Sequence, residues 1–396
     1  IDISDEDLHE LATKITKAGI NIEKVITNHI DNLVIGEVTE CYDHPDSDHL
    51  HVCKVNTGSE TYQIVCGAPN VRVGLKVIVA LPGAILPGDF KIKKSKIRGV
   101  ESNGMLCALY ELGLEEKNDE TYAKGIEELP NDAKVGADPI KYLHLEETLY
   151  ELDIHKHRNN DCYYHIGFAY EIACILNKKV TLPDVSHKEV ADNIKEHFSL
   201  KVETEKCPFY LAKMVKNVQI KESPEFIKRR LTRAGMRSIN NVVDISNYVM
   251  LEFGQPLHFF DKDKLGNNIL VRNAKNNEEI TTLDGKERRL KESDIVITDG
   301  KKPVCVAGVM GGENTEVTEN TSTILIESDI FDPISIRYTA KNLDLKSEAS
   351  IRYGKGLNYE YTILALNRAC HLLEKYADAT ILSGVVSYDN IDKSEK

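Results

Sequence analysis

The feature that most constrains the fold is a change of pattern within the first half of the chain. Between about residues 32 and 114, short apolar runs such as LVIGEVTECY and LKVIVALPG alternate with Gly, Pro and Asn. Runs of this length, bounded by turn residues, predict strands, and a closely spaced series of them predicts a small β-barrel. Helical patterns stand on both sides of this segment, so we expect the barrel to be inserted into another domain.

The flanking segments carry ordinary helix signals. Residues 1–27 predict a helix with Ser4 as its N-cap, apolar side chains at helical spacing and Gly19 as its end. Residues 149–180 predict a strand, a turn and an amphipathic helix. The two flanks are therefore expected to form one split domain.

The remainder of the chain mixes strands and helices. One helix is predicted from an N-cap at Ser223, with Pro224 as its first residue, to about Gly235. A second is predicted from Asn241 to Phe253, and a last one spans residues 359–377. Strands are predicted at residues 201–205, 209–218, 269–272, 294–298, 303–309 and 323–328.

We therefore predict a multidomain α+β protein. It consists of a split α/β domain with an inserted oligonucleotide-binding-type β-barrel, followed by a mixed α+β module. The predicted split domain comprises residues 1–35 and 147–190, the barrel residues 36–140, and the module residues 195–390.

Charge and cysteine usage limit the function classes. The net charge of −13 argues against a protein that wraps duplex nucleic acid, so any nucleic-acid contact must be local. Nine cysteines without a C-x-x-C pair favour reduced thiols and a cytoplasmic protein. No apolar run approaches the ~20 residues that span a bilayer. The first residue is Ile1 and the chain ends on DNIDKSEK, so we expect a piece of a longer protein.

A cluster of potential metal ligands lies at residues 41–55, CYDHPDSDHLHVCKV. Its cysteines, histidines and aspartates could each bind zinc, but their spacing matches no zinc template. Turn residues followed by strand alternation explain the segment without a metal. We predict no metal site.

A basic strip stands out in this acidic chain. It comprises Lys91, Lys93, Lys94, Lys96 and Arg98. A β-barrel with a basic edge is typical of an oligonucleotide-binding fold, and a solvated charged strand is the alternative. The aromatic side chains that would stack bases are few, and Phe90 is the main ring nearby.

Two further residues stay ambiguous on local grounds. His258 lies in GQPLHFFD, among apolar residues just after a Gly and a Pro, and is either a core histidine or a site residue. Glu327 lies in the apolar strand ILIESDIF and is either an exposed strand charge or a carboxylate turned toward a cavity.

Longer motifs resolve part of this ambiguity. One set of stretches resembles the tRNA-binding domain shared by several synthetases and tRNA-binding proteins: HPDSDHLHVCKV, QIVCGAPNVRVGLKVIVALPGAILPG, FKIKKSKIRGVESNGMLC and ELGL. A second set is similar to an editing module: MRSINNVVDISNYVMLEFGQPLHFFD, AGVMGGENTEV, ILIESDIFDPISIR and LKSEASIRYGKG. In this order they resemble the N-terminal half of the β subunit of bacterial phenylalanyl-tRNA synthetase, over essentially the whole chain.

The sequence departs from that family at a few places. HKHRNNDC stands where the family has a T-P-N-R-type turn, Gly354 stands in place of an acidic residue, and LNYE replaces a D-P pair. These positions touch the split domain and the edge of the editing module.

The resemblance implies tRNA binding by the barrel and hydrolytic editing of mischarged tyrosyl-tRNA(Phe) by the module. It implies that His258 and Glu327 are catalytic, with Glu327 accepting the tyrosyl hydroxyl and His258 orienting water. A hydrophobic pocket alone rejects an added hydroxyl only weakly, by about 100-fold. A second site that hydrolyses the wrongly charged product would therefore improve accuracy. The implied substrate-binding residues are Arg237, Ser246, Asn247, Pro256, Gly311, Ser347 and Ala349.

The resemblance also sets expectations for the whole enzyme. It implies a class II phenylalanine–tRNA ligase of two alpha and two beta subunits that uses ATP and Mg²⁺, with no cofactor in this chain. Two alternatives stay open: a tRNA-binding adaptor that uses only the barrel, and a structural subunit without editing activity.

Overall fold

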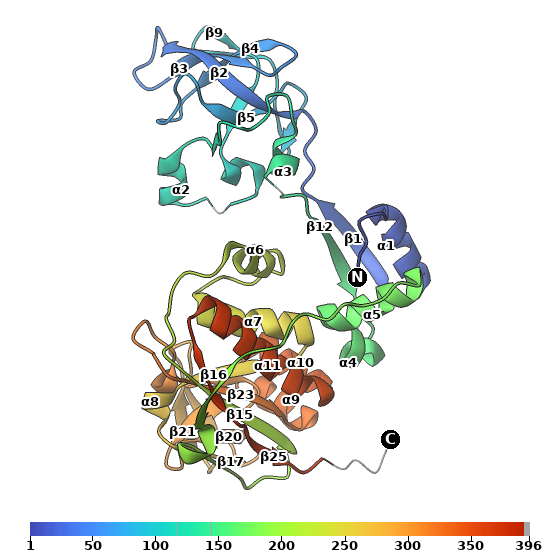
Figure 1. Ribbon diagram of the computed structural model, residues 1–396, viewed down its shortest axis with the longest axis vertical. Coiled ribbons are helices and arrows are strands. Elements are labelled where there is room, and N and C mark those ends of the chain that lie inside the picture. Colours follow the sequence, from blue (N-terminus) through green and yellow to red (C-terminus); the bar gives the residue numbers. More distant parts are fainter. Residues whose placement is uncertain (116, 144, 392–396) are drawn as a thin grey trace. The chain divides into compact units, whose positions relative to one another are not determined.

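The computed structural model describes residues 1–115, 117–143 and 145–391 (Figure 1). The chain divides into two compact units: unit 1 comprises Ile1–Glu23 and Leu152–Lys396, and unit 2 comprises Lys24–Glu151. Unit 2 is thus inserted in the sequence of unit 1, and the protein is multidomain α+β. The three-part division predicted from the sequence stays a prediction. Within the described residues, no helix is long and apolar enough to cross a membrane.

Unit 2 is built around an antiparallel sheet of six strands, in the order β10-β5-β2-β3-β4 with β11 also paired to β5. Apolar side chains are buried on both faces of this sheet, with Ile35 and Ile78 in one cluster and Val55 and Val77 in another. The strands of the sheet are β2 (Leu33–Asp43), β3 (His51–Asn56), β4 (Thr61–Cys66), β5 (Lys76–Ala80), β10 (Met105–Cys107) and β11 (Glu128–Leu129).

In the described part of unit 2, two hairpins and three short helices lie outside this sheet. The hairpins are β6 (Ile85–Leu86) with β7 (Phe90–Lys91), and β8 (Ser95–Ile97) with β9 (Val100–Ser102). The helices are η1 (Leu109–Leu112), α2 (Asp119–Lys124) and α3 (Pro139–Tyr142). The boundary between the units falls within the paired strands β1 (Asn21–Thr27) and β12 (Thr148–Asp153).

Unit 1 has three layers: helices, a mixed six-stranded sheet and a five-stranded sheet (Figure 1). The six-stranded sheet has the order β13-β24-β15-β23-β16, with β25 paired to β15. Its strands are β13 (Glu189–Asn193), β15 (Phe209–Lys216), β16 (Leu257–Asp261), β23 (Ile324–Ile330), β24 (Thr380–Ser383) and β25 (Val386–Asp389).

Strand alternation divides the six-stranded sheet into two buried faces. One face, which carries Phe259 and Ile326, packs against α6 (Glu225–Arg233), α7 (Asn241–Phe253) and α11 (Glu360–Tyr376). The other face, which carries Phe260 and Leu325, packs against the five-stranded sheet and against α9 (Pro333–Asn342) and α10 (Glu348–Lys355).

The five-stranded sheet has the order β14-β17-β20-β21-β22. Its strands are β14 (Ser199–Val202), β17 (Asn268–Asn273), β20 (Ile295–Thr298), β21 (Pro303–Val306) and β22 (Met310–Gly311). The remaining elements of unit 1 are α1 (Leu8–Lys17), η2 (Lys156–Arg158), α4 (Asn159–Cys162), α5 (His165–Leu176), η3 (Ile194–Glu196), α8 (Lys262–Leu265), β18 (Glu278–Thr281), β19 (Glu287–Leu290) and η4 (Glu313–Thr315).

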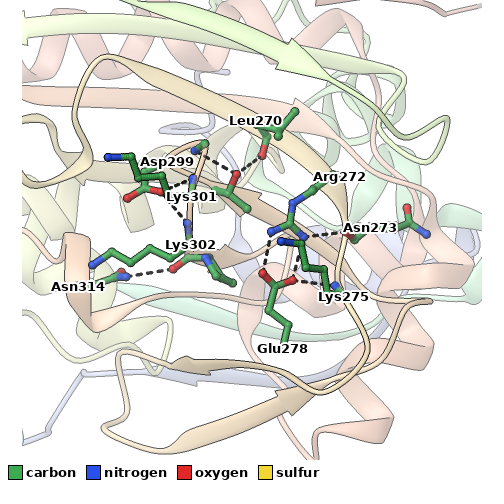
Figure 2. A network of polar contacts seen from close by, with 12 residues as sticks. Leu270, Arg272, Asn273, Lys275, Glu278, Asp299, Lys301, Lys302 and Asn314 are labelled. Atoms are coloured by element: carbon green, nitrogen blue, oxygen red, sulfur yellow. Dashed lines mark hydrogen bonds and ion pairs between the residues drawn. The ribbon is translucent and has the colours of Figure 1, made fainter.

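Polar contacts hold the turns of the five-stranded sheet, as Figure 2 shows. The Asp299 carboxylate accepts the backbone N–H groups of Lys301 and Lys302 at 2.8 Å each and so closes the turn after β20. Arg272 of β17 donates two hydrogen bonds to Glu278, at 2.8 and 2.7 Å, and both side chains are largely buried. A bidentate pair of this kind fixes the position of β18 against β17.

Two predicted helix starts are wrong. Asp7, not Ser4, caps α1, because its carboxylate accepts from the N–H groups of His9 and Glu10. Pro224 is the N-cap of α6 rather than its first residue. The Ser223 hydroxyl instead donates to buried Asp244, at 2.5 Å.

Candidate functional site

The predicted editing residues meet where β16 pairs with β23. Helix α7 ends at Gly254, which adopts the left-handed conformation at φ 77° and turns the chain toward β16. A side chain at this position would also collide with the Tyr164 ring, since an added Cβ would lie 2.6 Å from Cδ1. In the antiparallel register, His258 lies directly opposite Glu327. Directly opposed residues share one face of a sheet, and this face is the one that packs against the five-stranded sheet.

The imidazole of His258 fits into a space left by a glycine. A Cβ on Gly311 would lie 2.3 Å from His258 Cε1 and 2.8 Å from Nε2. The ring packs edge-on against Phe260, with 4.3 Å between centroids. Its Nε2 is buried without a hydrogen-bond partner among the described residues. Burial lowers the pKa of His258 to about 4, so the ring is neutral at pH 7 and offers a free nitrogen.

Glu327 is a buried carboxyl group with a tyrosine as its partner. The Tyr210 hydroxyl of β15 donates to Glu327 Oε2 at 2.9 Å, and the Glu327 residue is only 3% exposed. Burial, and then the neighbouring carboxyl of Asp329, raise the pKa of Glu327 well above its ordinary value. On the next position of the same face, Asp329 accepts from the Tyr353 hydroxyl of α10.

Sequence reasoning missed Tyr210, Asp329 and Tyr353. The pattern ESD at residues 327–329 did hold a signal, because residues two apart in a strand share a face. A second acid on the face of Glu327 could have been found this way. The two tyrosines lie far from it in the sequence and had no such signal.

Pro256, Ser347 and Ala349 lie on segments that border this face. Pro256 is buried between Gly254 and β16, and the neighbouring Gln255 donates from Nε2 to the Asp329 carbonyl oxygen at 2.9 Å. Ser347 caps α10 by accepting the Ser350 N–H, and its hydroxyl donates to the Val309 carbonyl at 2.6 Å. Val309 stands just before β22, so this bond ties α10 to the strand that holds Gly311. Ala349 is partly buried against the same core.

Arg237, Ser246 and Asn247 lie on the helical side. Ser246 and Asn247 are half-buried on α7, which packs against the opposite face of the six-stranded sheet. The Ser246 hydroxyl donates to the Val243 carbonyl at 2.8 Å. Arg237 is exposed in the connection between α6 and α7. The structure thus brings His258, Glu327 and Gly311 together. It places Ser246 and Asn247 in the helical layer on the other side of the sheet, and Arg237 in the connection between two helices of that side.

Unit 2 carries a groove beside the basic strip. All five strip side chains, Lys91, Lys93, Lys94, Lys96 and Arg98, are exposed. A groove of about 870 Å³ is lined by Lys91 and Lys93 together with three aromatic side chains, Phe90, Tyr110 and Tyr122. Phe90 is 57% exposed and Tyr122 64%. More aromatic surface therefore lies beside the strip than Phe90 alone, which was the ring evident from sequence.

The ligand-rich segment 41–55 has structural contacts. The buried His44 ring uses both nitrogens: Nε2 lies 3.1 Å from the Ile97 carbonyl oxygen, and Nδ1 accepts the Asp46 N–H at 3.0 Å. Two other acidic clusters in the described chain have metal-like spacing, at Asp161-Cys162-Glu171 and Asp192-Glu196-His197. Each already holds a protein cation, Arg158 in the first and Lys216 in the second.

Comparison with known proteins assigns the two regions that carry these features. Residues 33–138 match the family described as a putative tRNA binding domain, and residues 206–378 match the B3/4 domain. The phenylalanine–tRNA ligase beta subunit of Bacillus cereus (strain ZK / E33L) is 47% identical over 402 aligned positions, covering 100% of this chain and 50% of that protein. The Geobacillus kaustophilus beta subunit is 48% identical over 392 positions, covering 98% and 49%.

A solved N-terminal fragment of the Pyrococcus horikoshii phenylalanyl-tRNA synthetase beta subunit is more distant. It is 16% identical, covers 61% of this chain and 66% of that one, and superposes with a TM-score of 0.35, which is too low to bear on the fold.

These matches define a multidomain chain that joins a tRNA-binding domain to a B3/4 domain. The chain belongs to the family of phenylalanine–tRNA ligase beta subunits, and it spans about half the length of the curated relatives it matches.

Proposed function

We propose that this chain is the N-terminal part of a phenylalanine–tRNA ligase beta subunit that binds tRNA and hydrolyses mischarged tyrosyl-tRNA(Phe). The observation that carries the proposal is the direct opposition of His258 and Glu327 across β16 and β23, with Gly311 making room for the imidazole. Burying polar side chains on an apolar face costs free energy, and His258 Nε2 has no hydrogen-bond partner among the described residues, so this pair marks a candidate ligand site.

Glu327 supplies the selectivity in this proposal. The tyrosyl side chain differs from the phenylalanyl one by a hydroxyl, and a buried acceptor left unpaired by phenylalanine costs about 1–3 kcal/mol. Glu327 Oε2 accepts one bond from Tyr210, and a carboxyl group has further lone pairs to accept a substrate hydroxyl. The neighbouring tyrosine therefore orients the acceptor without using up its capacity.

His258 supplies a neutral nitrogen beside the scissile ester. Because burial keeps the ring unprotonated, Nε2 can hold and orient the attacking water. We do not assign it the whole proton transfer, since an ester is already activated and the terminal ribose hydroxyl of the tRNA can share that role.

The test of editing is deacylation of purified tyrosyl-tRNA(Phe) by the full chain and by the enzyme assembled with its alpha subunit. Glu327→Ala should lower the rate by about 10²–10³, because it removes the acceptor of the tyrosyl hydroxyl and enlarges the pocket, whereas Glu327→Gln should retain more because an amide oxygen still accepts. His258→Ala should slow hydrolysis with less change in binding. Glu319→Ala, at an exposed acid of the same unit, is the matched control. Parent rates in Glu327→Ala would exclude the assigned role.

A second candidate is a structural subunit without editing activity. The observation in its favour is that Glu327 is 3% exposed and already bonded to Tyr210. This candidate predicts no hydrolysis of tyrosyl-tRNA by the parent protein, so the same assay separates the two. An adaptor that uses only unit 2 is disfavoured, because residues 206–378 match the B3/4 domain.

For unit 2 we propose an oligonucleotide-binding-type barrel that holds single-stranded RNA in the groove. Its lysines neutralise phosphates and its three aromatic rings stack bases. Each phosphate that a cation neutralises contributes about −0.7 to the slope of log K against log salt for a single strand. If three to five of the strip cations do so, the slope is about −2 to −4. Replacing Lys93, Lys94 and Lys96 with Ala should flatten that slope, while Lys134→Ala, at an exposed lysine outside the strip, should change it by less than one. An unchanged slope in the triple variant would mean that the strip is only a solvated face.

The remaining properties belong to the assembled enzyme. We propose a cytoplasmic ligase of two alpha and two beta subunits, which binds ATP and Mg²⁺ outside this chain. Co-purification with the alpha subunit and the mass of the complex test this assembly.

A further inference from the structure

Two acids lie side by side in the interior of unit 1. Glu327 and Asp329 are alternate residues of β23 and therefore point to the same face of the sheet. Their exposed fractions are 3% and 0%. In the described chain neither forms an ion pair with a lysine or arginine, so no neighbouring cation offsets their charges.

The donors around the acids are too few for two carboxylates. Tyr210 donates to Glu327 Oε2, and Tyr353 donates to Asp329 Oδ1. Asp329 Oδ2 is buried and has no hydrogen-bond partner among the described residues. Two neutral phenols cannot balance two buried negative charges, and like charges this close in a dry interior do not both ionise.

We propose that Glu327 and Asp329 hold one proton between them, donated by the Glu327 carboxyl to Asp329 Oδ2, and that Asp329 thereby positions the Glu327 acceptor. This arrangement gives Asp329 Oδ2 the partner it otherwise lacks. It leaves a single negative charge, on Asp329, stabilised by the Tyr353 hydroxyl. Glu327 is then fixed from two sides, by Tyr210 and by Asp329.

The titratable surroundings fit a single shared proton. Among the described residues, the titratable groups near the pair, apart from the two acids, are Tyr210, Tyr353, Cys207, Cys305 and His258. Burial raises the pKa of both tyrosines and both thiols and lowers that of His258, so all five are neutral at pH 7. Burial also raises the pKa of Asp329 to about 6 and raises that of Glu327 well above its ordinary value. Because Asp329 Oδ2 lacks a donor while Glu327 Oε2 already accepts from Tyr210, the shared proton is placed on Glu327, facing Asp329 Oδ2.

The functional consequence rests on the proposed editing function. If Glu327 accepts the tyrosyl hydroxyl, Asp329 is a positioning residue for specificity that does not itself touch the substrate. Asp329→Ala removes the acceptor of the shared proton and loosens the Glu327 carboxyl. Asp329→Asn keeps an oxygen that accepts this proton but removes the charge.

A titration of the full chain tests the pair without reference to activity. Carbon-13 NMR of protein labelled at the Glu and Asp carboxyl carbons, assigned with Glu327→Gln and Asp329→Asn, follows each acid. We expect Glu327 to stay protonated at pH 7, and Asp329→Asn to lower the pH at which it titrates by at least one unit, because the like charge is gone. Two acids that both titrate near pH 4, or a Glu327 titration that is the same in Asp329→Asn, would overturn the proposal.

Deacylation separates this proposal from the proposed function. The ratio of tyrosyl- to phenylalanyl-tRNA hydrolysis should fall about tenfold or more in Asp329→Ala and should be largely restored in Asp329→Asn. Unchanged discrimination in Asp329→Ala, in a parent that edits, would overturn the positioning role. If the titration shows the shared proton but the parent does not hydrolyse tyrosyl-tRNA, the shared proton is supported and the proposed editing function is wrong. If Asp329→Ala does not fold, the titration of Asp329→Asn still decides whether Glu327 and Asp329 share a proton.

Discussion

Replacing Gly311 with alanine should displace His258 and little else. The added Cβ would lie 2.3 Å from His258 Cε1, whereas unstrained carbon atoms lie about 3.5–4 Å apart. The ring must therefore move by about 1 Å or more, and Phe260 packs edge-on against it at 4.3 Å. Overpacking of this kind costs about 1–3 kcal/mol of unfolding free energy.

The effect on hydrolysis should exceed the effect on stability. A misplacement of about 1 Å in a catalytic group lowers rates by about 10²-fold, so Gly311→Ala should reduce tyrosyl-tRNA deacylation on that scale. Single-turnover deacylation and denaturant unfolding of the same preparations measure both quantities. Gly235→Ala is the control for replacing a glycine, since an added Cβ there meets no atom within 4 Å, although its φ of +78° carries its own strain.

A double-mutant cycle with His258→Ala isolates the clash. When the imidazole is absent, the alanine at Gly311 has room, so its cost in stability should largely disappear. The coupling energy between the two changes should be about 1–3 kcal/mol, as for residues in direct contact. Parent rates and an unchanged unfolding midpoint in Gly311→Ala would refute the packing argument, and additive effects in the cycle would show that the two residues do not compete for space.

Three further outcomes are expected. Asp244→Ala should destabilise unit 1 by about 3–5 kcal/mol in denaturant unfolding, because two serine hydroxyls and one backbone N–H lose a fully buried acceptor; a loss below 1 kcal/mol would contradict this. Gly254→Ala should lower the thermal midpoint, because it combines a φ of 77° with a Cβ placed 2.6 Å from the Tyr164 ring, and an unchanged midpoint would show that the end of α7 adjusts freely. The pKa of His258 falls from 6.5 to about 4 on folding, so its contribution to stability is complete above about pH 6.5 and is lost as the pH falls through 4; His258→Gln should flatten this acid limb of the stability curve.

Local sequence determined the elements around the site. The helix predicted from Asn241 to Phe253 is α7, and the predicted terminator Gly254 ends it in the left-handed conformation. Alternation placed Ile326 and Glu327 on opposite faces of one strand, and the structure shows Ile326 against the helices. These features depend on spacing within one segment, where capping and period-two alternation act directly.

Only the tertiary structure decided which of these residues meet. The register of β23 sets His258 opposite Glu327 on one neighbouring strand and Tyr210 opposite Asp329 on the other. It also placed Ser246 and Asn247 on a helix behind the opposite face of the sheet. The sequence contains each of these residues but not their pairing, because strand register is set by the joint packing of two layers of side chains rather than by any one segment. The charge state of the buried acids follows from the same packing, since it depends on the donors and cations that the fold places around them.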